Sequence, residues 1–264
     1  MSTPIIKDMT SWKDWNGYQE SSVITVGLFG FLVLTGVILR KRNSLYIRYK
    51  SIDELHPKYL KKTHRLRGYG TTVRDGDNFR FYHVPEFKMM YWLMRGKREL
   101  KYMSRTKEEL KAMRKSGTIA IRLAGIDAPE SAHFGMEKQP LSEEATEYLK
   151  NLLQTENELN MHLRKVIVEP LKRDQYGRLV SMVYYQPIPF IPWYKNVSEE
   201  MLKLGLAVVY TAAGAEYGNI EERLMKLESI AKKRRKGIWG LDNFVSPGKH
   251  KELFRAKKEK EDTK

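Results

Sequence analysis

A run of 18 residues without a charged side chain dominates the N-terminal part of the chain. It reads "SVITVGLFGFLVLTGVIL" from Ser22 to Leu39, and three cations follow it directly at residues 40–42. As a helix it would be about 27 Å long, close to the roughly 30 Å hydrocarbon core of a bilayer. A helix of a globular core is disfavoured because the run is apolar on every side. A cleaved signal peptide is disfavoured because residues 1–21 are slightly acidic rather than basic. The run therefore predicts a single transmembrane anchor at residues 22–39.

Positive charge accumulates after this run. Residues 40–67 hold ten Lys and Arg against two acids, which predicts a basic juxtamembrane connector at 40–66. The positive-inside rule then places the C-terminal part of the chain on the positive-inside face of the membrane. The whole chain has a formal net charge of +16, which favours a polyanionic partner, although basic runs are often only solvated surface. The chain has no cysteine, which excludes disulfides and thiolate metal sites.

The remainder alternates between short strand patterns and helical patterns. Segments rich in Ile, Val and Tyr predict five strands: "GTTV" near Gly70, "NFRFYHV" near Phe79, "TIAIRLAGI", "RKVIVEPL" and "RLVSMVYY". Helical spacing of apolar residues predicts three helices, which begin near Ser142, Ser198 and Asn219. The pattern indicates an α+β domain in which about three helices pack on a small closed barrel. The charged segment 241–264 is predicted to be disordered.

Three separated segments combine carboxylates with arginines. They are "VRDGDNF" with Asp75 and Asp77, "IRLAGIDAPE" with Arg122, Asp127 and Glu130, and "KRDQYGRLV" with Asp174, Tyr176 and Arg178. Taken singly, each is compatible with an ordinary turn or hairpin loop. Two carboxylates and an arginine at the end of one apolar strand predict instead a site for a metal ion and an anion together. The six histidines lack metal-ligand spacing, so zinc is not supported.

In this order the three segments resemble the active-site segments of the staphylococcal nuclease family. The segments "SEEATEYLKNLL", "SEEMLKLGLAVV" and "AKKRRKGIWG" resemble its three helices and its terminal Ile-Trp. The resemblance implies a five-stranded OB-type barrel over residues 67–240, with an insertion at 84–117. Together with the predicted anchor, it is most similar to the membrane-anchored mitochondrial endonucleases of fungi. A mitochondrial location is an expectation from that subgroup.

The resemblance also implies a role for each candidate residue. The ligands of Ca²⁺ would be Asp77, Asp127 and the backbone carbonyl of Ala128. Glu130 would position or deprotonate the attacking water. Arg122 and Arg178 would grip the phosphate, with Tyr176 beside it, and Tyr210 or, less clearly, Tyr217 would stack on a base. Calcium prefers several oxygen ligands, and two aspartates leave room for water and a phosphate oxygen. A metal ion and two guanidinium groups stabilise the transition state of phosphodiester cleavage more than its ground state. At position 128 the family's founding enzyme has threonine, but only the carbonyl would be a ligand.

The expected function is a membrane-anchored, calcium-dependent endonuclease for DNA, RNA or both that leaves 3′ phosphates. Its partners would be nucleic acid and a lipid bilayer, and no protein partner can be inferred. The alternatives are a non-catalytic nucleic-acid-binding module and a membrane tether that recruits proteins. Degenerate copies of this domain lose carboxylates or arginines, whereas this chain keeps the complete set, which favours an enzyme. The insertion at 84–117 mixes aromatic residues with ten cations and could contact nucleic acid, contact the membrane or elaborate the packing.

Overall fold

The computed structural model describes residues 25–31, 47–60, 64–85, 117–132, 137–155, 164–188 and 191–262. The chain divides into two compact units, Met1–Asn43 and Ser44–Lys264. In the first unit, residues 25–31 are helical. The rest of the predicted anchor lies outside the described residues, as does most of the predicted insertion. Within the described ranges, no helix is both long enough and apolar enough to cross a membrane.

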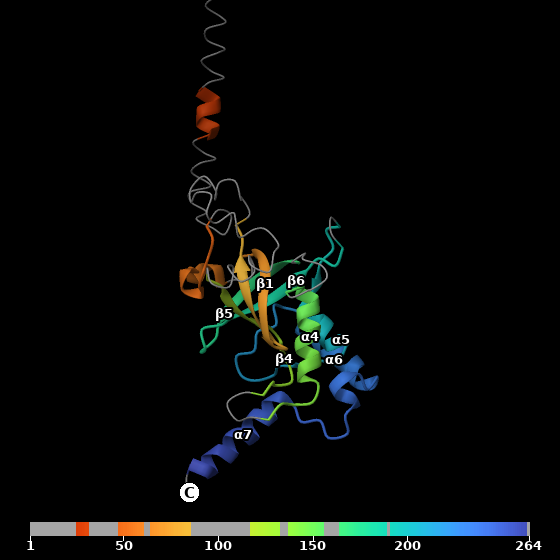
Figure 1. Cartoon of the computed structure of the whole chain (residues 1–264). Coiled ribbons are helices and arrows are strands. Elements are labelled where there is room, and N and C mark those ends of the chain that lie inside the picture. Colours follow the sequence, from red (N-terminus) through yellow and green to blue (C-terminus); the bar gives the residue numbers. More distant parts are fainter. Residues whose placement is uncertain are drawn as a thin grey trace, which may run out of the picture. The chain divides into compact units, whose positions relative to one another are not determined.

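The second unit is built on a closed five-stranded barrel (Figure 1). Its strands are β1 (Leu66–Asp75), β2 (Asn78–His83), β3 (Ile119–Leu123), β5 (Lys165–Arg173) and β6 (Leu179–Tyr185). They pair in the order β3-β2-β1-β5-β6, with antiparallel neighbours, and a parallel pairing of β3 with β6 closes the barrel. The short strand β7 (Lys195–Asn196) extends β6, and β4 (Ile126–Asp127) pairs separately with β8 (Val208–Val209). The predicted five-stranded barrel is confirmed.

Strand β3 shows how the pleat separates the core from the site. Ile119, Ile121 and Leu123 are buried in the hydrophobic core, whereas Ala120 and Arg122 between them are partly exposed. Successive side chains of a strand point to opposite faces, so the side chain of Arg122 leaves the barrel on the side away from these three residues. An apolar strand can therefore carry a charged group without burying it in the core.

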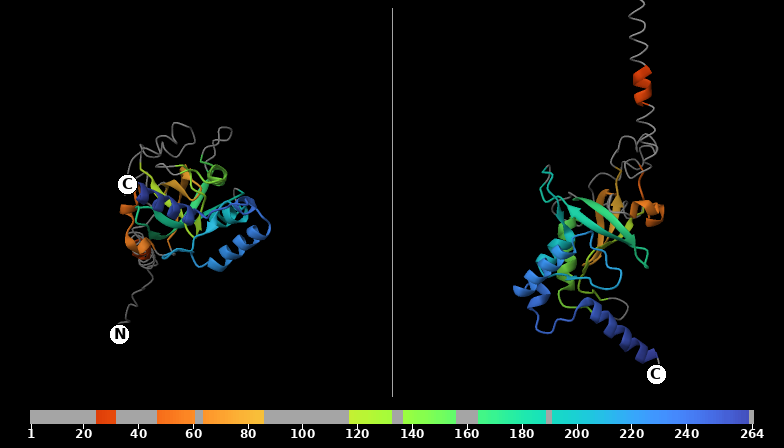
Figure 2. Two further views of the ribbon diagram at one scale, coloured as in Figure 1. Left: turned by 90° about the horizontal axis from the view of Figure 1, so that it is seen from below. Right: turned by 180° about the vertical axis from the view of Figure 1, so that it is seen from behind.

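Three helices cover the barrel, as predicted (Figures 1 and 2). They are α4 (Ser142–Leu153), α5 (Val197–Lys203) and α6 (Glu221–Lys233), and α6 leads into the 3-10 helix η4 (Gly237–Gly240). Asn196 rather than Ser198 caps α5, because its side chain accepts a hydrogen bond from the backbone N–H of Glu199. The hydroxyl of Ser198 instead donates to the carbonyl of Ala124, 2.9 Å away, in the turn between β3 and β4. Helix α5 thereby holds the turn that precedes Asp127.

The predicted basic connector differs from the structure, because much of it packs on the barrel. It forms the short 3-10 helices η1 (Ile52–Glu54) and η2 (Pro57–Leu60). Its buried side chains join the hydrophobic core of the barrel: Tyr49, Ile52, Leu55 and Tyr59. The backbone N–H of Tyr49 also donates to Nδ1 of His83, at 3.0 Å. The domain therefore begins before residue 67, and the cations of this segment lie between apolar side chains that belong to the core.

The C-terminal segment also differs from its prediction, since helix α7 (Pro247–Asp262) replaces the expected disorder. The hydroxyl of Ser246 accepts a hydrogen bond from the backbone N–H of Lys249, and Pro247 occupies the first helical position. Both are typical of a helix start, and the Lys, Glu and Ala residues that follow favour a helix. In Figure 1 the first turn of α7 lies near the chain that follows β4, and its far end points away from the barrel.

Candidate active site

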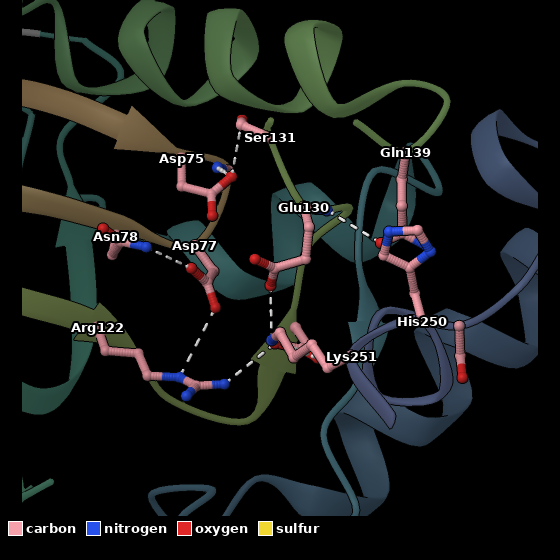
Figure 3. A network of polar contacts seen from close by, with 12 residues as sticks. Asp75, Asp77, Asn78, Arg122, Glu130, Ser131, Gln139, His250 and Lys251 are labelled. Carbon is pink, nitrogen blue, oxygen red and sulfur yellow. Dashed lines mark hydrogen bonds and ion pairs between the residues drawn. The ribbon is translucent and has the colours of Figure 1, made fainter. Parts of the chain in front are cut away.

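Two of the three predicted segments meet at one end of the barrel. The turn between β1 and β2 supplies Asp77, strand β3 supplies Arg122, and the chain from β4 onward supplies Asp127 and Glu130. The three carboxylates are almost fully buried, with exposed fractions of 4%, 2% and 6%. In Figure 3 the side chains of Asp77, Arg122 and Glu130 point toward one another from different elements. The β3–β4 turn and the β1–β2 turn thus bring charges from distant parts of the sequence into one cluster.

Arg122 is the centre of this cluster. Its Nη2 donates to Oδ1 of Asp127 at 3.1 Å, and its Nε lies 3.6 Å from Oδ2 of Asp77. Burial alone would lower the pKa of Arg122, but the charges of the two aspartates outweigh burial and raise it. The guanidinium carbon also lies 4.8 Å from the ring centroid of Tyr210, a cation–π distance. The structure therefore places Tyr210 beside the arginine that was predicted to grip a phosphate.

The position of Asp77 depends on close packing at Gly76. A Cβ atom on Gly76 would lie 2.7 Å from Cβ of Ala128 and 2.8 Å from Cβ of Ala145 in α4. Only glycine lets the β1–β2 turn approach the chain after β4 and helix α4 this closely. Next to Asp77, Nδ2 of Asn78 donates to its Oδ1 at 2.8 Å, which fixes the carboxylate. Asn78 therefore orients a candidate metal ligand.

Glu130 is fixed by its neighbours in the loop. Its backbone N–H donates to Oε1 of Gln139 at 3.0 Å, and the N–H of Gln139 donates back to its carbonyl at 2.9 Å. Burial, followed by the charges of Asp77 and Glu130, raises the pKa of nearby Asp75 to about 6. The hydroxyl of Ser131 donates to the same carboxyl group at 3.1 Å, as Figure 3 shows. The site therefore holds more carboxylates than the positive charge of Arg122 can neutralise.

Lys251 of helix α7 supplies a second cation that the sequence did not predict. Its Nζ lies 2.6 Å from Oε1 of Glu130 and 3.1 and 3.4 Å from the two carboxylate oxygens of Asp127. Burial would lower the pKa of Lys251, but these carboxylates outweigh burial and raise it. The side chain crosses from the C-terminal helix into the middle of the cluster (Figure 3).

The chemistry of this cluster fits a divalent cation. Burial and the charge of Asp77 raise the pKa of Asp127, even though Lys251 and Arg122 act in the opposite direction. Two buried aspartates thus repel each other and would gain from a cation between them. In the described part of the chain, no three His, Cys, Asp or Glu side chains are arranged so that together they could hold one metal ion. The fit therefore rests on Asp77 and Asp127, with the backbone carbonyl of Ala128 and water as further oxygen ligands.

The third predicted segment forms a separate ion pair. Nε of Arg178 donates to Oδ2 of Asp174 at 2.7 Å, and its backbone N–H donates to Oδ1 at 2.8 Å. The guanidinium carbon lies 5.3 Å from the ring centroid of Tyr176, whose side chain is 65% exposed. Arg178 directly precedes Leu179, which pairs with Ile121 next to Arg122. The backbone therefore places Arg178 at the start of the strand next to that of Arg122, although Arg178 pairs here with Asp174 rather than with the carboxylates of the cluster.

Comparison with known proteins places this arrangement in a family. Residues 120–240 match the model of the staphylococcal nuclease homologues. The probable endonuclease LCL3 of Komagataella phaffii is 37% identical over 240 residues, which cover 88% of this chain and 93% of that protein. The chain belongs to the staphylococcal nuclease family. A probable endonuclease of Schizosaccharomyces pombe, C19F8.04c, is 36% identical over 84% of this chain and 91% of its own. The probable endonuclease LCL3 of Candida dubliniensis is 39% identical over 78% of this chain and 80% of its own length.

Membership in this family confirms the predicted resemblance and the predicted enzyme class, a hydrolase of the nuclease type. Sequence reasoning missed Lys251 and Gln139, which lie in segments with no recognisable motif. It noted Asp75 but gave it no role, although the Asp-Gly-Asp spacing already brings a second carboxylate to the same turn. The metal and phosphate roles of the individual residues remain predictions.

Proposed function

We propose that this protein is a membrane-tethered, calcium-dependent endonuclease that cleaves DNA, RNA or both and leaves 3′ phosphates. The observation that carries the proposal is the convergence of Arg122 on the buried carboxylates of Asp77 and Asp127, with Glu130 alongside. On a barrel of a nuclease family, this combination supplies oxygen ligands, a base and an anion clamp in one place.

Asp77, Asp127 and the carbonyl of Ala128 are the residues that would hold calcium. When bound, calcium supplies positive charge to a phosphate oxygen and favours deprotonation of a water molecule. Glu130 accepts the proton of the attacking water, and its backbone hydrogen bonds with Gln139 keep the loop in place. The carboxylate is engaged by Lys251 in this structure, so that contact has to open first.

The two arginines serve the phosphate. Arg122 presents its guanidinium between the aspartates and the ring of Tyr210, and Arg178 directly precedes the neighbouring strand β6. The pair with Asp174 uses Nε of Arg178, and a guanidinium has further N–H donors for phosphate oxygens. Water adds to phosphorus, the bond to the 5′ oxygen breaks, and that oxygen takes up a proton. The products are a 3′ phosphate and a 5′ hydroxyl.

The membrane tether rests on the uncharged run at residues 22–39 and on the cations that follow it. A mitochondrial membrane is part of the proposal through the resemblance to the fungal subgroup. After alkaline carbonate treatment of a membrane fraction, we expect the intact protein to stay in the pellet. Recovery in the supernatant would refute the tether but not the nuclease.

The nuclease is tested with the full-length protein purified in detergent. We expect cleavage of labelled DNA or RNA with calcium, none in excess chelator, and products whose 5′ hydroxyl a kinase phosphorylates without prior phosphatase treatment. Replacing both aspartates (Asp77→Asn with Asp127→Asn) should abolish cleavage. Glu130→Gln should slow it by roughly a hundred- to ten-thousandfold while binding of uncut nucleic acid persists. Undiminished cleavage by the double variant in excess chelator would refute the metal mechanism.

A further inference from the structure

The start of helix α7 is fastened to the active site by three contacts. Nζ of Lys251 pairs with Glu130 and Asp127 at 2.6 and 3.1 Å. Nε2 of His250 lies 3.1 Å from the carbonyl of Glu137. Just ahead of the helix, the carbonyl of Val245 accepts a hydrogen bond from Nε2 of Gln139 at 2.8 Å. Figure 3 shows Lys251 and His250 reaching in from the helix on the side of Glu130 and Gln139.

Gln139 connects this docking to the catalytic loop. Its Oε1 accepts from the backbone N–H of Glu130, and its Nε2 donates to Val245. The side chain is 4% exposed, so both hydrogen bonds are sheltered from water. The same amide therefore holds the loop of the predicted base and the segment that leads into α7. The tail is seated by a specific network and not by charge attraction alone.

The ammonium of Lys251 stands where a cation would neutralise the site. It contacts both carboxylate oxygens of Asp127 and one of Glu130, all of them nearly buried. A lysine ammonium is a compact point charge with three donors, and it can satisfy several carboxylate oxygens at once. Ca²⁺ held by Asp127 would use the same carboxylate oxygens. The two cations carry like charge and would compete for these oxygens, so docking of α7 and binding of calcium oppose each other.

Docking also occupies the predicted base. A Glu130 carboxylate that already accepts the Lys251 ammonium at 2.6 Å is held away from a water molecule that it should deprotonate. The docked helix thus opposes catalysis twice, through a metal ligand and through the base. Both effects come from one side chain.

We propose that helix α7 is a built-in competitive inhibitor of the active site, in which Lys251 substitutes for the divalent cation until calcium displaces it. The inference rests on the proposed calcium-dependent nuclease and adds a regulatory role for the C-terminal segment. The inhibited form is the one described by this structure. Calcium both releases the tail and completes the site, so the enzyme needs a higher calcium concentration than the bare site would.

The attachment is suited to reversible release. The side chain of Lys251 is 32% exposed, so solvent reaches the ion pairs and weakens them. Beyond the first turn, Leu253 is 55% exposed, and the far end of α7 projects away from the barrel (Figures 1 and 2). Because apparent affinity falls in proportion to the fraction of molecules that are open, a docked fraction of about nine-tenths weakens calcium binding about tenfold.

The test compares Lys251→Met with Lys249→Met in the full-length protein in detergent. Lys249 is exposed on the same turn of α7, so this control removes the same charge without removing the contact. Calorimetric titration with calcium should show about tenfold tighter binding for Lys251→Met and unchanged binding for Lys249→Met. The calcium concentration that gives half-maximal cleavage should fall by the same factor, while the rate at saturating calcium stays at the wild-type value. A truncation after Val245 should reproduce the Lys251→Met result.

Release of the helix can be measured separately, because the chain has no native cysteine. Spin labels on Glu147→Cys in α4 and Leu253→Cys in α7 should give a narrow distance distribution without calcium. Calcium should broaden it, and Lys251→Met should broaden it in the absence of calcium. A distribution that stays narrow under both conditions would overturn the inference.

The outcomes separate the inference from the proposed function. If no variant binds calcium and the wild type lacks nuclease activity, the proposed function fails and the inference fails with it. If the wild type is a calcium-dependent nuclease but Lys251→Met binds calcium no more tightly, only the inference fails. If Lys251→Met and the truncation lose activity at saturating calcium, Lys251 supports catalysis instead of opposing it, and the inference is again refuted.

Discussion

Replacing Gly76 by alanine should damage the active site more than the fold. The new methyl carbon would lie 2.7 Å from Cβ of Ala128 and 2.8 Å from Cβ of Ala145. Carbon atoms pack at about 3.5–4.0 Å, so each contact is short by about 1 Å. Both neighbouring methyl groups are attached rigidly to buried backbone, with exposed fractions of 1% and 0%. The β1–β2 turn must therefore move outward by about 1 Å and carry Asp77 with it.

Two measurable effects follow from this displacement. Overpacking of this kind costs about 1–3 kcal/mol, which urea unfolding of the Gly76→Ala protein should show. A misplacement of about 1 Å in a catalytic constellation can cost about a hundredfold in rate. We therefore expect kcat/KM for nucleic-acid cleavage at saturating calcium to fall about a hundredfold.

Two further variants separate geometry from stability. Leu153→Val removes a buried carbon near the opposite end of α4, which should cost about 1 kcal/mol and leave the cleavage rate unchanged. Adding Ala145→Gly to Gly76→Ala relieves one of the two contacts and should restore part of the rate. A Gly76→Ala protein that is destabilised as expected but cleaves at the wild-type rate would refute the link between this packing and the position of Asp77.

Three other predictions follow from the same structure. Burial lowers the pKa of His83 to about 3 from its ordinary 6.5, so the unfolded chain binds a proton that the folded one excludes. When the pH falls from 7 to 5, the free energy of unfolding should therefore decrease by about 2 kcal/mol, and the His83→Gln protein should lack this decrease. Arg178→Ala should slow cleavage by on the order of a hundredfold, with little loss of binding to uncut nucleic acid. Arg178→Lys should restore little of the rate, because an ammonium cannot form the bidentate contact. Equal losses of rate and affinity would contradict the role of Arg178 in the transition state. A protein that begins at Lys61 should be less stable by several kcal/mol than one that begins at Ser44. The shorter protein lacks the four buried side chains of residues 49–59, each of which contributes about 1.5–3 kcal/mol. Equal urea midpoints of the two proteins would show that this segment does not stabilise the barrel.

The parts of the fold that local pattern controls were predictable from the sequence. The Ile-rich segment "TIAIRLAGI" predicted a strand, and helical spacing after Ser142 predicted α4; both are present in the structure. Helix starts were less reliable, as the cap of α5 shows. Both Asn196 and Ser198 can cap a helix, and only the position of the carbonyl of Ala124, 74 residues away, decides that Ser198 bonds there instead.

The segment before the barrel was harder to interpret for a related reason. Tyr49, Ile52, Leu55 and Tyr59 follow one another at spacings of three, three and four residues, but the run is short, and only Ile52 and Tyr59 lie in 3-10 helices. Periodicity identifies only regular elements, and a short irregular segment can be buried without one. The cations around it suggested a solvated connector, whereas the apolar side chains between them are part of the core.

The balance of buried charges in the site predicts a second cation, which the sequence motifs alone did not identify. The motifs bring together Asp77, Asp127 and Glu130 as buried carboxylates, with Arg122 as the only cation that the same motifs place among them. Buried charges require partners, so this excess of carboxylates predicts that another cation must enter the site, whether a metal ion or a side chain.

In this structure the second cation is the side chain of Lys251, 124 residues beyond Asp127. It lies in a segment whose mixed Lys and Glu composition is equally typical of disorder. Local composition could not select that lysine, because the lysines around it have the same propensities, and the contacts of Lys251 depend on its place in the folded chain. The excess of buried carboxylates nevertheless explains why a helix with little apolar surface docks at all. A cation that replaces Lys251 at Asp127 should therefore weaken the attachment of the whole helix.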